Sequence, residues 1–349
     1  ETLQRWLWLA TLSLIVAMNA SVAEEFSLLG TALAVIISRT CWRLNTVGTR
    51  GLQADDYLMV VAACAYSAET YLAYSVGIMW HGLANNGMTD EERRLLDPSS
   101  EEYMLRVNGS KTQLAGWNTY TFLLWTMKSA MCTYYIRLTD RLQYKRRIFI
   151  GFTLIALTWI AAHLSILLGC LPLKKNWQIY PDPGIACQPA ISRINIFVVS
   201  GLNVLTDIYL LTIPIPMLWK ANIRPMKKVA LIVTFSGGIF VISAGTLRSV
   251  LIITNPIDGA EQAGSWAIRE TFVAVITTNL PIIAPMFRLW MTPIVNTVRK
   301  SVGTSGSDDP GICNIHLEGR DPRRGKWPRS IDQIPYPSFN ESEERLNRP

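Results

Sequence analysis

Residues 148–170 read IFIGFTLIALTWIAAHLSILLGC, a stretch without a single Asp, Glu, Lys or Arg. A helix rises about 1.5 Å per residue, so about 20 apolar residues cross the hydrocarbon layer of a membrane, which is roughly 30 Å thick. The stretch is apolar on nearly every side of the helix that it would form, as a lipid-embedded helix should be. It therefore predicts a membrane-spanning helix.

Similar apolar runs recur along the chain. Over the whole sequence, 50% of the residues are hydrophobic and only 17% are charged. A soluble protein of this length would carry more charge on its surface. We therefore expect an all-α, multi-pass membrane protein, a bundle of seven transmembrane helices. The predicted spans are Phe26–Trp42, Asp56–Trp80, Asn118–Ile136, Ile148–Cys170, Ile194–Trp219, Val229–Thr254 and Ala267–Trp290.

Basic residues gather in alternate connections between these spans, whereas the other connections are acidic or mixed. Loops rich in Lys and Arg stay in the cytosol. The pattern predicts that the amino end lies outside and that the carboxyl tail is cytosolic. The basic residues concerned are Arg43, Arg50, Arg137, Arg141, Lys145, Arg146, Arg147, Lys220, Arg224, Lys227, Lys228, Arg299 and Lys300.

Two features of the predicted outer loops agree with this orientation. Asn108-Gly-Ser110 is a glycosylation sequon between the second and third spans. Cys170 and Cys187 bracket the loop after the fourth span, where an oxidising compartment allows a disulfide. A chance sequon and two free thiols are the alternatives.

The chain divides into residues 1–25, a membrane domain over residues 26–291, and a tail over residues 292–349. Near the start, one basic residue precedes an apolar core and then small residues, which is typical of a signal peptide. The alternative is an unusually short first span. The tail is rich in Gly, Pro, Ser, Asp and Arg, so we expect it to be disordered and cytosolic.

The composition also argues against a metal centre and against a nucleic-acid partner. The six cysteines form no CxxC motif, and only three histidines are present. The basic residues that give a net charge of +7 stand in short patches beside apolar runs and form no continuous face. We expect as partners the lipid bilayer, a small lipophilic or polar ligand and a cytosolic signalling protein, in the plasma membrane or an endomembrane.

Ionisable residues inside apolar runs are costly, so they usually face the bundle interior and find partners there. We interpret five such polar residues as one cluster that opens outward and binds a ligand. From the rise per residue of a helix, Lys128 lies about 15 Å and Asp207 about 20 Å below the outer surface. A long Lys side chain could bridge this difference in depth. Ion pairs that merely lock helices together, and an ion or proton path, are the alternatives. The cluster comprises Lys128, Asn203, Asp207, Arg248 and Glu270.

Other polar residues lie outside this cluster. Glu69 and His163 fall within the second and fourth spans. Asp55 and Asp56 stand at the start of the second span, where carboxylates cap free backbone N–H groups and favour the positive end of the helix. We expect them to cap the helix and to pair with nearby arginines.

An ordered set of motifs resembles the fungal rhodopsin-domain family, which includes Pth-type receptor-like proteins and satratoxin-cluster-type membrane proteins. The resemblance covers about Phe26 to Trp290, and its motifs run from the start of the second predicted span to the seventh. They are Asp55-Asp56-Tyr57, Gly77 with His81, Lys128, Cys170…Trp177…Cys187, Asn203…Asp207, Pro214-Ile-Pro216, Gly238, Arg248, Trp266…Glu270 and Asn279-Leu-Pro281. One departure is Met79, which stands where the family usually has a second glycine.

The resemblance implies a seven-helix fold and a receptor-like function, but it does not imply retinal. A retinal Schiff base needs a lysine in the seventh helix, and Ala267–Trp290 contains none. We expect no cofactor. The alternative function is a membrane-bound enzyme or accessory protein of secondary metabolism, in which Asp207 or Glu270 acts as acid or base beside Lys128 or Arg248 in a cyclisation or isomerisation. A transporter has the thinnest support, because inverted repeats are not visible.

Overall fold

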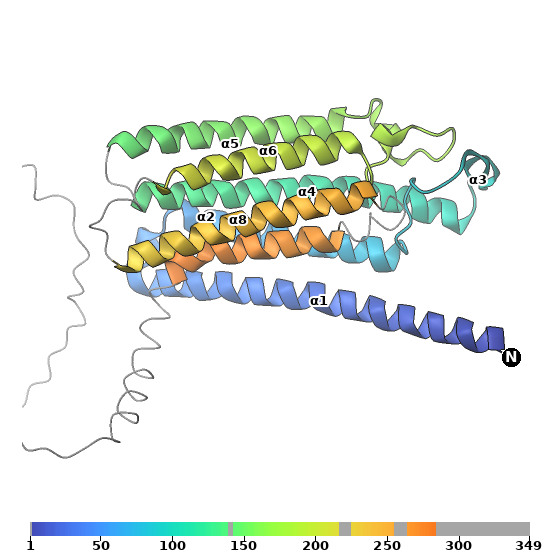
Figure 1. The fold of residues 1–349 in the computed structure, drawn as a ribbon, viewed down its shortest axis with the longest axis horizontal. Helices are drawn as coiled ribbons and strands as arrows, with labels where there is room; N and C mark the ends of the chain where they lie inside the picture. The colour runs from blue at the N-terminus through green and yellow to red at the C-terminus, as the bar shows by residue number, and fades with distance from the viewer. Residues whose placement is uncertain (1, 139–141, 216–224, 255–263, 284–349) are drawn as a thin grey trace, which may run out of the picture. The chain divides into compact units, whose positions relative to one another are not determined.

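The computed structural model describes residues 2–138, 142–215, 225–254 and 264–283. These residues form helices and short turns, with no β-strand among them (Figure 1). The predicted all-α class is therefore confirmed for the described part of the chain. The expected disordered tail, the basic loop around Lys220 and Arg224, and the sixth-to-seventh connection lie outside the described residues.

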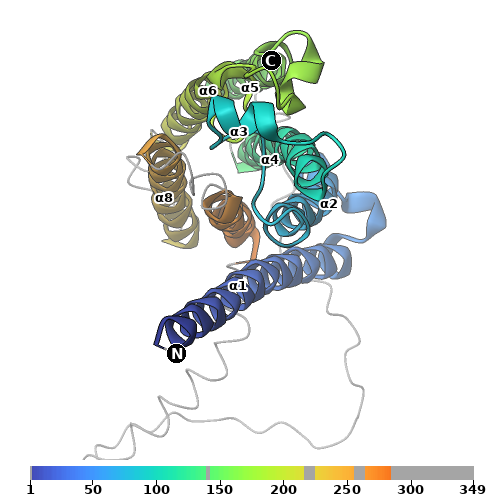
Figure 2. The same cartoon turned by 90° about the vertical axis from the view of Figure 1, so that its right-hand side faces the viewer.

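Long helices run side by side and form the body of the molecule (Figure 1, Figure 2). From α1 to α8, each long helix packs against the next one along the chain. The helix of residues 264–283 lies beside α1 and α2 as well as α8 in the end-on view of Figure 2. The long helices are α1 (Thr2–Val47), α2 (Ala54–Tyr74), α4 (Glu101–Leu138), α5 (Leu142–Leu168), α6 (Arg193–Thr212), α8 (Pro225–Thr254) and the helix of residues 264–283.

Four of these helices contain segments long and apolar enough to cross a membrane. They are Ser21–Val47 in α1, Lys145–Leu168 in α5, Arg193–Thr212 in α6 and Phe235–Thr254 in α8. The other long helices are more polar: α2 carries Asp55, Asp56 and Glu69, and α4 begins with a charged stretch.

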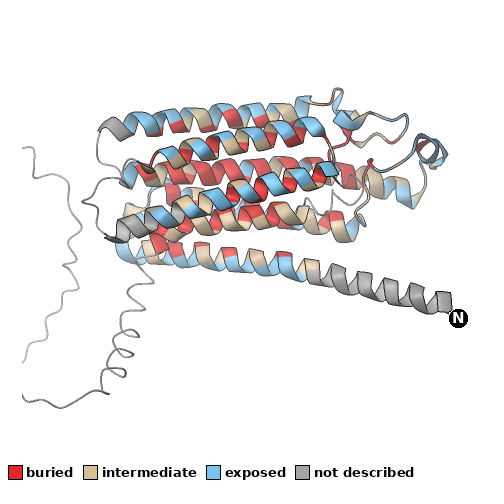
Figure 3. Ribbon diagram, viewed as in Figure 1, coloured by how far each residue is buried: buried red, intermediate tan, exposed pale blue. Residues whose placement is uncertain are grey.

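Exposed and buried residues alternate along the long helices (Figure 3), and many of the exposed side chains are large and hydrophobic. On α5, Phe149, Leu157 and Leu164 are exposed at helical spacing. Charged side chains such as Lys128 and Glu270 are buried instead. A helix bundle with apolar side chains on its exterior and charged side chains buried within its core is the arrangement that a lipid environment favours.

The segment after α2 was predicted to be a loop up to Asn118, where the third span was expected to begin. In the structure, the helix α4 already begins at Glu101. Acidic residues in its first turn favour the helix terminus. Gly109 then lets α4 lie directly against the backbone carbonyl of Leu83, which any Cβ atom would overlap. Asn108 therefore lies on a helix, next to the buried Ser110, and its glycosylation stays a prediction.

The first helix is also longer than expected. α1 runs without a break from Thr2 to Val47, through the whole predicted signal peptide and the first predicted span. Removal of the amino-terminal segment as a signal peptide stays a prediction.

The end of the bundle that carries the disulfide is closed by two connections that bind each other. Cys170 and Cys187 form the expected disulfide, with an S–S distance of 2.05 Å. The buried Asn85 side chain donates hydrogen bonds to the backbone oxygens of Asn176 (3.1 Å) and Cys187 (3.2 Å). Arg93, also buried, donates to the backbone oxygens of Ile179 and Asn85. We call this region the disulfide end.

Replacing both Cys170 and Cys187 by Ser should lower the free energy of unfolding by about 3 kcal/mol, because the bridge closes a loop of 17 residues and restricts the unfolded chain. Thermal unfolding of the purified chain in one detergent measures the change. Cys64→Ser, which removes an exposed free thiol, is the control. An unchanged melting temperature in the double variant would show that this bridge does not stabilise the fold.

Candidate functional site

The 264–283 helix places Glu270 at the centre of the bundle, fully buried. Its Oε2 accepts a hydrogen bond from the Tyr120 hydroxyl at 2.9 Å and lies 3.4 Å from Nε of Arg248. Its Oε1 accepts a hydrogen bond from the Asn203 side chain at 3.2 Å. A buried carboxylate is stable only with such partners, and here they come from α4, α6 and α8.

A glycine on α8 allows this close approach. A Cβ atom at Gly245 would lie 2.7 Å from Oε1 of Glu270, well inside contact distance. Small residues at helix contacts are how membrane helices come close to one another. Sequence reasoning did not single out Gly245 or Tyr120, because neither is unusual within an apolar run.

The second buried ion pair joins Lys128 of α4 to Asp207 of α6. The Lys128 ammonium also donates a hydrogen bond to the backbone oxygen of Asn203 at 3.2 Å. Since the Asn203 side chain donates to Glu270, this residue connects the two ion pairs. The structure thus brings all five residues of the predicted cluster into one network, together with Tyr120.

The network borders two separate cavities, so its members do not share one pocket. Arg248 lines a cavity of about 90 Å³ at the disulfide end, which has room for several water molecules. Lys128 and Asp207 line a second, mostly apolar cavity of about 60 Å³. We call the first the disulfide-end cavity.

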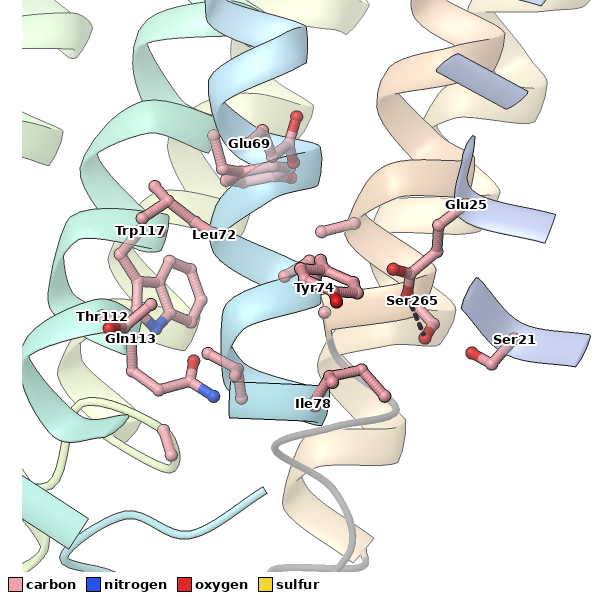
Figure 4. A pocket seen from close by; sticks show the side chains of 18 of the residues that line it. Ser21, Glu25, Glu69, Leu72, Tyr74, Ile78, Thr112, Gln113, Trp117 and Ser265 are labelled. Carbon is pink, nitrogen blue, oxygen red and sulfur yellow. Dashed lines mark hydrogen bonds between the residues drawn. The ribbon is translucent and has the colours of Figure 1, made fainter. Parts of the chain in front are cut away.

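The disulfide-end cavity is bounded by α1, α2, α4, α8 and the 264–283 helix (Figure 4). Its aromatic wall includes Trp117 and Tyr120, over whose rings the Arg248 guanidinium lies at 5.1 Å and 4.1 Å from the centroids. Its polar wall includes Glu25 and Glu69. The cavity can therefore take a molecule with both an apolar body and a polar group.

Glu69 is a site residue that the predicted cluster left out, although its position inside an apolar run was a usable signal. Its side chain on α2 is only 4% exposed and lines the cavity. Neither carboxylate oxygen has a hydrogen-bond partner within the described residues.

The opposite end of the bundle holds a second polar group, centred on Arg39 of α1. The guanidinium is 1% exposed and donates to Asp55 at 2.7 Å, to Asp56 at 3.3 Å and to Asn279 of the 264–283 helix at 3.0 Å. Arg43 pairs with Asp56 at 3.1 Å. Asp56 also accepts a hydrogen bond from the backbone N–H of Gln53, so the expected capping and ion pairing are confirmed.

The contacts of Arg39 with Asp55 and Asn279 were not predicted from the sequence, although an arginine inside the first predicted span was a usable signal. With Asn279 at one end and Glu270 at the other, the 264–283 helix takes part in both polar groups. It also contacts α2 through the Tyr66 hydroxyl, which donates to the backbone oxygen of Ile268 at 3.3 Å.

Comparison with known proteins gives relatives of two kinds. Receptor GIN3 of Arthrobotrys oligospora is 22% identical over 193 residues, which are 54% of this chain and 46% of that protein. The polyenoic acids biosynthesis gene cluster protein Ba17b of Metarhizium anisopliae is 26% identical over 221 residues, which are 58% of each chain. The matches thus span about half the length of these relatives. No solved structure matches the chain.

The fungal rhodopsin domain family matches residues 38–289, which are more than half of the chain. This range contains both ion pairs, the disulfide and most of the cavity wall. The resemblance seen in the sequence motifs is confirmed, and this chain belongs to the fungal rhodopsin domain family.

Proposed function

We propose that this chain is a receptor-like membrane protein that crosses the bilayer seven times and binds a small molecule in the disulfide-end cavity. The observation that carries the proposal is a cavity with an aromatic and polar wall, directly beside the buried Arg248–Glu270 pair. Arg248 contacts the ligand. The rest of the network holds the surrounding helices together, and its contacts change when the ligand binds. These residues are Glu270, Asn203, Lys128 and Asp207.

The proposed topology uses each of the long helices as one span, with the disulfide end outside and residues 292–349 in the cytosol. The disulfide supports this orientation, because disulfides persist in oxidising compartments. The basic connections predicted to be cytosolic follow the positive-inside pattern.

The 264–283 helix offers a physical route from the cavity to the opposite end. Glu270 and Asn279 are nine residues apart, which corresponds to about 13.5 Å along a helix. A ligand that displaces Arg248 from Glu270 changes the partners of this helix at one end. At the other end the helix holds Arg39, so its movement alters the contacts of α1 and α2 that face a signalling protein.

The relationship to Receptor GIN3 supports this function, and the match to Ba17b supports an alternative. In that alternative the chain is a membrane-bound enzyme or accessory protein of a biosynthetic pathway. Asp207, whose Oδ2 is buried without a hydrogen-bond partner among the described residues, or Glu270 would then exchange protons with a lipophilic intermediate.

Filling the cavity tests the receptor function. A Cβ atom on Gly116, which lines the cavity, meets no atom within 4 Å, so Gly116→Leu occupies the cavity without a clash at Cβ. Gly201 on α6 has the same free space but lies on an exposed face, so Gly201→Leu is the matched control. In a deletion strain, Gly201→Leu should restore the transcriptional response that the deletion removes, and Gly116→Leu should not. A full response from Gly116→Leu, at equal amounts in the membrane, would contradict the proposal.

The enzyme alternative makes a different prediction. Asp207→Asn and Glu270→Gln should leave the chain in the membrane but cause a pathway intermediate to accumulate, because a proton donor or acceptor is lost while the side-chain size is kept. Metabolite profiling of the variant strains measures this. Normal product levels in both variants would exclude the alternative.

A further inference from the structure

We propose that the ligand of the disulfide-end cavity carries a protonated amine, and that the Glu69 carboxylate binds this cation. This inference rests on the proposed function for its cavity and adds the chemical class of the ligand. Its basis is the charge distribution around the cavity, where one buried acid has no counterpart.

The other acids near the cavity have partners. Glu270 is bound by Arg248, Tyr120 and Asn203. Glu24 forms a double hydrogen bond with Arg269, at 2.7 Å and 2.8 Å. Glu25 accepts a hydrogen bond from the Ser265 hydroxyl at 3.2 Å (Figure 4).

Glu69 differs from all of them. Among the described residues, no Lys, Arg or His nitrogen lies within 4.0 Å of its carboxylate, and neither oxygen accepts a hydrogen bond. Thr271 and Arg248 act on Glu69, but the Thr271 hydroxyl donates its one proton to the backbone oxygens of Ala267 (2.9 Å) and Ile268 (3.1 Å), and Arg248 is paired with Glu270. Ionising an acid in this state is costly, and a protonated amine in the cavity would offset the cost of the ionised form.

The remaining wall suits the rest of such a ligand. Leu72 and Trp117 supply apolar surface on the same side of the cavity as Glu69 (Figure 4), and Val76 lines the same cavity. An anionic ligand would meet Glu25 and Glu69, whereas Arg248, the one cationic side chain among the described residues of the wall, is paired with Glu270. The charges of the described wall therefore favour a cation over an anion.

Three probes that share a cyclohexyl ring and one further carbon test the inference: cyclohexylmethylamine, cyclohexylmethanol and cyclohexanecarboxylate. Binding to the purified full-length chain in lipid nanodiscs is measured by calorimetry and by the shift in melting temperature. The amine should bind about ten-fold more tightly than the alcohol, because a hydrogen bond between charged groups is stronger than a neutral one. The carboxylate should bind most weakly.

Variants assign the effect to one side chain. Glu69→Gln should bring the amine down to the affinity of the alcohol and leave the alcohol unchanged. Glu24→Gln, which changes the net charge equally but lies outside the cavity wall, should keep the preference for the amine. Gly116→Leu should weaken both probes.

Equal affinity for the amine and the alcohol, a preference for the carboxylate, or an amine preference that survives Glu69→Gln would overturn the inference. Failure of the amine to bind at millimolar concentration would overturn it too. If Gly116→Leu abolishes the cellular response while the amine shows no preference, the cavity is a ligand site for another chemical class. If Gly116→Leu has no cellular effect, the proposed function itself fails.

Discussion

The arrangement of the helices depends on one constraint: a carboxylate at the centre of an apolar bundle must be bound by its neighbours. Glu270 meets this constraint with two hydrogen bonds, from Tyr120 and Asn203, and an ion pair with Arg248, so its partners come from three other helices. The contact with α8 further requires a residue without a side chain at position 245. Because these partners lie on α4, α6 and α8, the network joins three helices to the 264–283 helix.

This constraint explains which parts of the site could be predicted from the sequence. Charges inside apolar runs must find opposite charges, so Lys128 could be matched with Asp207, and Arg248 with Glu270, from helical depth alone. The structure shows both pairs. That the pairs border different cavities depends on the packing of apolar side chains, which periodicity does not reveal.

The start of α4 and the role of Glu69 were also not predicted, because both depend on packing in three dimensions. The amino-terminal extension of α4 depends on its packing against residues 80–86, where Gly109 contacts Leu83 and the Ser110 hydroxyl accepts from the backbone N–H of Asn85. Hydropathy alone placed the start of the helix where the apolar run begins. The sequence shows Glu69 as an acid within a predicted span. Only the structure shows that its carboxylate has no hydrogen-bond partner among the described residues. Family membership does not decide between the functions, because one fold can serve several.

The position of Glu270 late in the chain has a consequence for biogenesis. Tyr120, Asn203 and Arg248 are synthesised before the residue that binds them all, so during insertion these groups must be hydrated, or shielded by the translocation machinery, until residues 264–283 emerge. The contacts of Glu270 therefore cannot form until this helix has been synthesised. A nascent protein that stops short of this helix would retain unsatisfied groups within the bilayer, which marks it for recognition by membrane quality control.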